Sequence, residues 1–204
     1  MVLTNGGMGI TQLILLVAIT TGDLHDGDLL FLQSTGDNAI TAVTTGVDSL
    51  PIDHVAVFHP MGGTPMVVEA LPGVGVTVTP LSSFVTQGMI VVGRVGEYDV
   101  NRSIERVLRC VGLEYDQYYD AGNDAVYCSE LVQQCYVDFD DNPVFEPIPM
   151  TFRDRSGNIP LSWVKHYAAI GRAVPEGEPG SNPGELSRRS NVSIIGLLES
   201  IDLP

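Results

Sequence analysis

The sequence is poor in positive charge. Lys and Arg together number 10 in 204 residues, against 25 Asp and Glu, so the formal net charge is −15. Binding to DNA or RNA depends on clustered Lys and Arg that contact phosphates, and docking on an anionic membrane depends on a basic patch. We therefore expect no nucleic-acid partner and no electrostatic docking on such a membrane.

The sequence also lacks a long hydrophobic run. Residues 10–19 form an apolar stretch of about ten residues, whereas a membrane-spanning helix needs about 20, so no stable membrane insertion is expected. The stretch has the length of the core of a secretory signal, but no Lys or Arg occurs before Arg94. Two interpretations of residues 1–22 stay open: a signal for export to the periplasm or cell envelope, and a packed N-terminal segment.

Cysteine is scarce, with only Cys110, Cys128 and Cys135. Cys128 and Cys135 lie two turns apart in a helical pattern, which separates them by about 10 Å along the helix. This distance is too long for a disulfide bond. No Cys-x-x-Cys pair occurs and the four histidines are scattered, so we expect no metal site and no cofactor. Cys110 is interpreted as a small buried apolar residue within a helix.

Apolar residues make up 44% of the chain, enough for the core of one domain. Short β-rich runs separated by Gly and Pro turns fill the first half, and helical periodicity follows, which predicts an α+β fold. We expect one main domain over 23–172 and a Pro/Gly-rich tail over 173–204, with 194–198 as a last anchor. The expected strands are 29–33, 53–59, 65–70, 74–79 and 89–95, and the expected helices are 38–45, 104–111, 128–138 and 161–170.

Three side chains suggest one reactive site. Cys128 begins a predicted helix, where the helix dipole and unpaired N–H groups favour the thiolate. His54 lies within a predicted strand on an apolar face, where its ring needs a polar partner. Glu69 lies near the end of the next strand, and antiparallel pairing would bring its carboxylate beside His54 to orient the ring.

Each of these residues also has a purely structural explanation. Cys128 continues the apolar stripe of its helix and fits a buried, inert cysteine. His54 alone fits a satisfied buried histidine, and Glu69 alone fits a carboxylate at a strand end that faces solvent. From the spacing alone, both interpretations stay open.

The order of several short motifs is more specific than any one residue. Gly-Asp-Leu-Leu-Phe at 27–31, Asp-His-Val-Ala-Val at 53–57, Val-Val-Glu-Ala at 67–70, Tyr-Asp at 115–116 and Tyr-Cys-Ser-Glu-Leu-Val at 127–132 occur in this order. The set resembles the YiiX/YebB-like family of circularly permuted papain-like cysteine hydrolases, which are relatives of NlpC-type cell-wall peptidases. The resemblance covers about residues 25–170.

This resemblance implies a small antiparallel barrel or curled sheet packed against a helix that carries the nucleophile. It implies Cys128 as nucleophile, His54 as general base and acid, and Glu69 as the residue that orients His54. The backbone N–H of Cys128 would be one oxyanion donor. Candidates for a second donor are the tyrosines at 115, 118 and 127.

The expected function is that of a cysteine amidase or peptidase that acts on a small peptide or amide through an acyl-enzyme. An exported enzyme of this kind fits amide bonds of cell-wall peptides. Two alternatives stay open. One is an acyl-transferring or lipid-directed thiol enzyme, because lecithin retinol acyltransferase-like proteins share the permuted fold. The other is a binding module that keeps the fold without the chemistry.

Overall fold

The computed structural model describes residues 17–35 and 38–199. Most of the apolar stretch at 10–19, and Asp37 at the start of the expected helix 38–45, therefore lie outside the described residues. None of the helices in the described ranges has the length and apolar character needed to cross a lipid bilayer.

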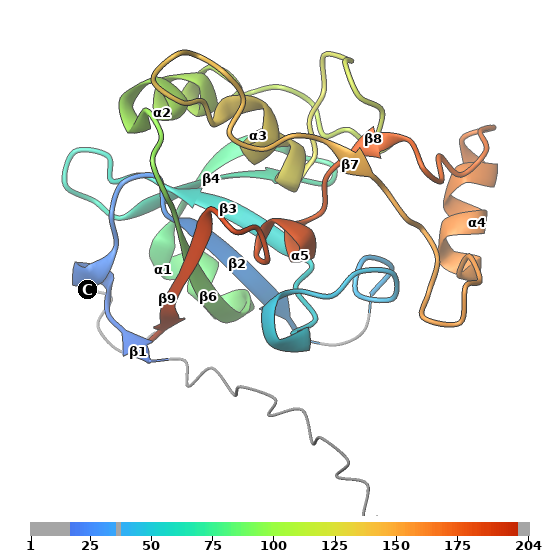
Figure 1. The fold of residues 1–204 in the computed structure, drawn as a ribbon, viewed down its shortest axis with the longest axis horizontal. Coiled ribbons are helices and arrows are strands. Elements are labelled where there is room, and N and C mark those ends of the chain that lie inside the picture. The colour runs from blue at the N-terminus through green and yellow to red at the C-terminus, as the bar shows by residue number, and fades with distance from the viewer. Residues whose placement is uncertain (1–16, 36–37, 200–204) are drawn as a thin grey trace, which may run out of the picture.

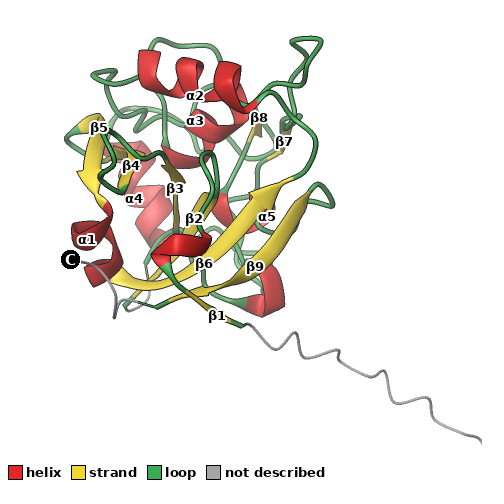
Figure 2. Cartoon of the chain, turned by 90° about the vertical axis from the view of Figure 1, so that its left-hand side faces the viewer, coloured by secondary structure: helices red, strands yellow, loops and turns green. Residues whose placement is uncertain are grey.

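The domain is built around one curled sheet of seven strands, in the order β1-β9-β6-β2-β3-β4-β5 (Figures 1 and 2). All pairs are antiparallel except β1 with β9. The sheet stays open, with β1 and β5 at its edges. Its strands are β1 Ala18–Ile19, β2 Leu29–Ser34, β3 His54–Phe58, β4 Met66–Leu71, β5 Gly75–Pro80, β6 Gly88–Val95 and β9 Val192–Leu198.

Helices cover both faces of the sheet, and each face has its own apolar core. One core joins alternate sheet residues such as Val55 and Val57 to α2, α3 and α5. The other joins Ala56 and Phe58 to α1. The helix α4 lies at the side of the domain, beyond the small ribbon of β7 and β8 (Figure 1). These elements are α1 Leu81–Phe84, α2 Val100–Arg109, α3 Cys128–Cys135, α4 Leu161–Ala169, α5 Pro183–Leu186, β7 Ile148–Pro149 and β8 Pro179–Gly180.

The α+β class and the curled sheet predicted from the sequence are confirmed, and the barrel alternative is not, because the described sheet does not close. The five expected strands match β2 to β6, and the three later helices match α2, α3 and α4. The expected helix at 38–45 is wrong, since residues 39–43 form turns. There the Asn38 side chain accepts hydrogen bonds from the N–H groups of Ile40 and Thr41, an alternative to helical pairing that Asn favours.

The Pro/Gly-rich tail expected over 173–204 contains regular structure, including α5 and β9. Residues 192–198 form β9, which lies inside the sheet between β1 and β6. Its register with β6 shifts between Val92 and Gly93, where a side chain on the glycine would meet Phe31 and Val192. Val192 is buried in the core that contains Val55 and Val57. The last anchor expected at 194–198 is therefore part of an interior strand of the sheet.

A buried ion pair joins the start of β2 to β6. The Arg94 guanidinium donates two hydrogen bonds to the Asp28 carboxylate, at 2.8 and 2.7 Å. Asp28 is only 1% exposed and also accepts from the backbone N–H of His25. Just before it, Gly27 has φ 80°, and a Cβ there would lie 2.1 Å from the Tyr98 hydroxyl. The Gly-Asp pair thus fixes where β2 begins.

We predict that Asp28→Asn lowers the free energy of unfolding by about 3 kcal/mol, because Arg94 loses its charged, bidentate partner. Urea unfolding followed by circular dichroism measures this change. Asp124→Asn at an exposed position is the matched control and is expected to change stability by less than about 0.5 kcal/mol. Equal stability of the two variants would contradict the importance of the pair.

Candidate active site

The cysteine predicted as nucleophile is the first residue of α3. Tyr127 precedes it in an extended conformation as the N-cap, and the Tyr127 N–H donates to the Glu130 carboxylate at 3.4 Å. The first hydrogen bond of the helix comes from the Leu131 N–H, so the N–H groups before it have no partner within the helix. Cys128 is 3% exposed, and its thiol lies at the positive end of the helix dipole.

The histidine and the glutamate come from neighbouring antiparallel strands. His54 is the first residue of β3, and the pairing of Val57 with Val68 places Glu69 of β4 opposite Ala56. Positions two apart share a face of a strand, so the two side chains can meet diagonally. They do: His54 Nε2 lies 2.8 Å from Glu69 Oε2, with Glu69 fully buried and His54 12% exposed.

The thiol of Cys128 lies close enough to the His54 ring to influence its pKa. Burial lowers the pKa of His54, but hydrogen bonds with Cys128 and Glu69 outweigh it and raise this pKa to about 10. The ring is therefore an imidazolium at neutral pH. Since Nε2 is bound to Glu69, Nδ1 is the atom left for the thiol. His54 and Cys128 also line one hollow together with Leu71 of β4 and Tyr115.

The structure thus brings the three predicted site residues together. Two of them come from the sheet and one from a helix, and Cys128 follows Glu69 by 59 residues in the sequence. His54 lies at the end of the sheet, 6.1 Å from the Phe84 ring, and α3 meets the strand at that end. An orienting carboxylate, an imidazolium and a thiol in this order can generate a nucleophilic thiolate and donate a proton to a leaving group.

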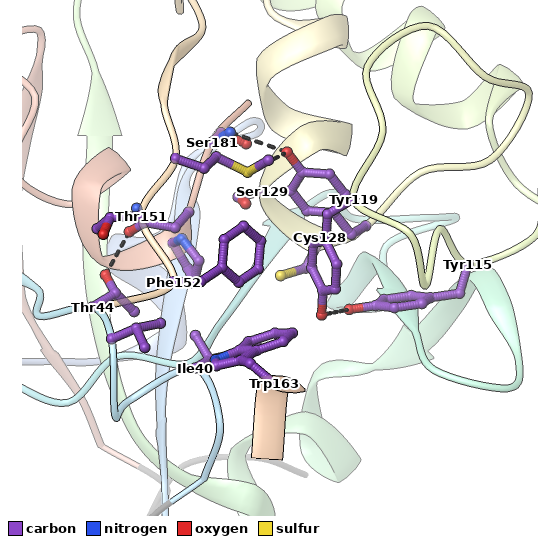
Figure 3. A pocket seen from close by; sticks show the side chains of 15 residues that line it. Ile40, Thr44, Tyr115, Tyr119, Cys128, Ser129, Thr151, Phe152, Trp163 and Ser181 are labelled. Carbon is purple, nitrogen blue, oxygen red and sulfur yellow. Dashed lines mark hydrogen bonds between the residues drawn. The ribbon is translucent and has the colours of Figure 1, made fainter. Parts of the chain in front are cut away.

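A second hollow lies on the other side of Cys128 and is mainly apolar (Figure 3). It contains about 460 Å³ of empty space, part of which is open to solvent. Phe152 and Trp163 meet edge to face at 4.9 Å, and the Trp163 indole N–H donates to the Ala39 carbonyl at 2.8 Å. The lining is contributed by residues 40–44, Tyr115, Tyr119, residues 127–129, residues 150–152, Trp163 and residues 181–183.

This apolar hollow was not foreseen from the sequence. Its walls come from six separate segments, and none of them shows a pattern that marks a binding site. Two polar atoms inside it stand out. The hydroxyls of Ser129 and Ser181 are buried and have no hydrogen-bond partner among the described residues.

The three tyrosines considered as second oxyanion donors have different surroundings in the structure. The Tyr127 hydroxyl accepts a hydrogen bond from the Ser181 N–H at 3.0 Å and donates one to the Met150 sulfur at 3.7 Å, so its partners are already in place. Tyr118 lies under the Arg172 guanidinium, at 5.1 Å, and lines neither hollow beside Cys128.

Tyr115 remains. It lines both hollows that contain Cys128, and its hydroxyl lies 3.4 Å from that of Tyr119 (Figure 3). Burial raises the pKa of Tyr119 to about 12 and raises the pKa of Tyr115 further. Both phenols are therefore protonated at neutral pH and can donate hydrogen bonds.

Known proteins share the fold of this chain. No curated protein matches the chain. A crystal structure described as metalloprotein yiiX from Escherichia coli O157:H7 has the same fold, with a TM-score of 0.67 and 22% identity over 84% of this chain and 96% of that chain. Residues 23–195 match the family model of the permuted papain-like amidase enzymes YaeF/YiiX, the C92 family. The chain therefore belongs to the C92 family of permuted papain-like amidases.

Proposed function

We propose that the protein is a cysteine amidase or peptidase that forms an acyl-enzyme on Cys128. The observation that carries the proposal is the buried Glu69 carboxylate bound to the His54 ring, which lines one hollow together with the thiol at the start of α3. Family membership supports amide hydrolysis in general. The purely structural explanation does not account for the position of His54 and Cys128 in the lining of one hollow, with Glu69 bound to the His54 ring.

The proposed reaction needs a thiolate on Cys128 and an imidazolium on His54. The Cys128 thiolate attacks the carbonyl carbon, and the His54 imidazolium gives its proton to the departing amine, which leaves an acyl-thioester and a neutral imidazole. The imidazole then takes a proton from water, and the resulting hydroxide attacks the thioester. Cys128 leaves as thiolate and His54 is again an imidazolium. Glu69 keeps the ring oriented throughout.

Two donors would stabilise the oxyanion that forms in each attack. One is the backbone N–H of Cys128, because N–H groups at a helix start point toward developing negative charge. We assign the other to the Tyr115 hydroxyl, which is protonated and lines the hollow shared by Cys128 and His54.

The proposed reaction uses no metal ion. The related yiiX structure is described as a metalloprotein. In the described ranges of this chain, no three His, Cys, Asp or Glu side chains lie close enough to hold a metal. The roles assigned above therefore rest on the side chains of the chain itself.

For the substrate we propose an amide bond in a small peptide such as those of the bacterial cell wall, which would place the enzyme outside the cytoplasm. The apolar hollow beside Cys128 favours a second candidate, an acyl-transferring or lipid-directed thiol enzyme, because aromatic walls fit an acyl chain better than a polar peptide. Product analysis separates the two: hydrolysis gives a free acid, and transfer gives a new ester or amide when an acceptor is added.

We predict that Cys128→Ser and His54→Ala each lower amide or ester hydrolysis by at least about 10³-fold. Glu69→Gln is expected to have a smaller effect, since it keeps a hydrogen-bond acceptor for the ring. Cys135→Ser is the matched control, because Cys135 lies in the same helix but away from the hollows. Loss of activity in a fully folded Cys135→Ser protein would show that the nucleophile is assigned wrongly.

We predict that iodoacetamide labels Cys128 of the folded protein at pH 7 faster than a free cysteine. A positively charged His54 ring, whose pKa is raised by its partners, would favour the reactive thiolate form. In His54→Ala the labelling rate at pH 7 should fall by about tenfold or more, as measured by peptide mass spectrometry. A Cys128 that reacts only after unfolding, whichever residue stands at 54, would instead support a non-catalytic binding module.

We predict that Tyr115→Phe lowers kcat by about 10²-fold with little change in KM, because an oxyanion donor acts mainly in the transition state. Tyr118→Phe is the control, since that ring lies under Arg172 and should keep full activity. Steady-state kinetics on the same ester substrate compare the two variants. Equal kcat values for both would remove Tyr115 from the oxyanion site.

A further inference from the structure

Two thiols that the proposed reaction does not use lie against each other. Cys110 is the C-cap of α2, and Cys135 is the last residue of α3. Their sulfur atoms are 3.6 Å apart, and both cysteines are free. A disulfide bond needs about 2.05 Å between the sulfurs, so a combined sulfur movement of about 1.5 Å would form one.

The surroundings give the two thiols different roles. Cys135 is 3% exposed within the main core, whereas Cys110 is partly exposed at the end of α2. The hydrogen bond with Cys135 lowers the pKa of Cys110, although burial opposes it. That hydrogen bond and burial together raise the pKa of Cys135. Cys110 is therefore the accessible thiol with the larger thiolate fraction.

From this geometry we propose that Cys110 and Cys135 are a redox-active pair, in which Cys110 attacks a small-molecule disulfide such as oxidised glutathione and Cys135 resolves the product. The resulting bond would join the C-terminal ends of α2 and α3. Cys128 cannot take part in it, because about two helical turns separate it from Cys135.

The exchange balances in two steps. The Cys110 thiolate attacks one sulfur of the small disulfide, which forms a mixed disulfide and releases one thiolate. Cys135 then loses its proton and attacks the Cys110 sulfur, so that the mixed disulfide breaks and the second small thiolate leaves. The two protein thiols are oxidised, the small disulfide is reduced to two thiols, and the two thiol protons pass to the released thiolates.

The bond would close a loop that carries much of the site. Residues 111–134 contain Tyr115, Tyr119 and the nucleophile Cys128, and the loop runs from the end of α2 to the end of α3. Tying its ends restricts the unfolded chain more than the folded one. Oxidation should therefore stabilise the segment that holds the nucleophile while leaving the thiol of Cys128 free.

The test uses the full chain incubated with oxidised glutathione, then unfolded and alkylated with iodoacetamide without reductant. We expect a 110–135 cross-linked peptide with the loss of two hydrogens for that bond, and Cys128 in no bond to another cysteine of the chain. In Cys128→Ser, which lacks the reactive thiol of the proposed site, the whole protein should become lighter by two hydrogens and take up no alkyl group. Thermal unfolding should show a Tm higher by about 5–10 °C, and dithiothreitol should reverse the shift.

Three variants make the result specific. Cys110→Ser and Cys135→Ser should lose the rise in Tm, and Cys128→Ser should keep it, so the outcome does not depend on enzymatic activity. Alkylation of all three cysteines after oxidation would overturn the proposal. A glutathione adduct that persists on Cys110, or a disulfide that includes Cys128, would overturn it as well.

Discussion

The hydrogen bond between the buried Glu69 carboxylate and the His54 ring is the constraint on which the rest of the site depends. A fully buried carboxylate without a partner would cost several kcal/mol, and here one of its oxygens is held by the ring at 2.8 Å. The other oxygen has no hydrogen-bond partner among the described residues. The pairing of β3 with β4 is therefore tied to the chemistry, because a slip of one residue would turn Glu69 to the opposite face.

The third member of the site comes from a different layer. The apolar stripe of α3, including Leu131 and Val132, packs with Val55 and Val57 in the core on one face of the sheet. His54 shares the other face with Ala56 and Phe58 but lies at the end of the strand. The thiol can reach the ring because α3 begins where β3 begins, so its position is set by core packing.

The parts that the sequence predicted are those with a local signal. Short β-rich runs between turns marked β2 to β6, helical periodicity marked α2, α3 and α4, and the Tyr-Cys-Ser-Glu motif marked a helix start. Other parts depend on distant partners. The strand β9 follows a Pro/Gly-rich stretch and is held by β1 and β6, and the contact of Cys110 with Cys135 depends on how two helices cross. The apolar hollow likewise needs α4 to lie against the 38–45 turn, through Trp163 and Ala39.

The geometry of the site does not require the order in which its residues occur along the chain. The described chain starts its sheet contribution at β1 and ends it at β9, and these two strands lie side by side in parallel. Strands that lie side by side can be connected, and the chain opened elsewhere, with little change to the core. Sheet residues followed by a helix, or a helix followed by sheet residues, then bring the same thiol to the same imidazole. Chain order therefore serves to recognise this family but does not determine its chemistry.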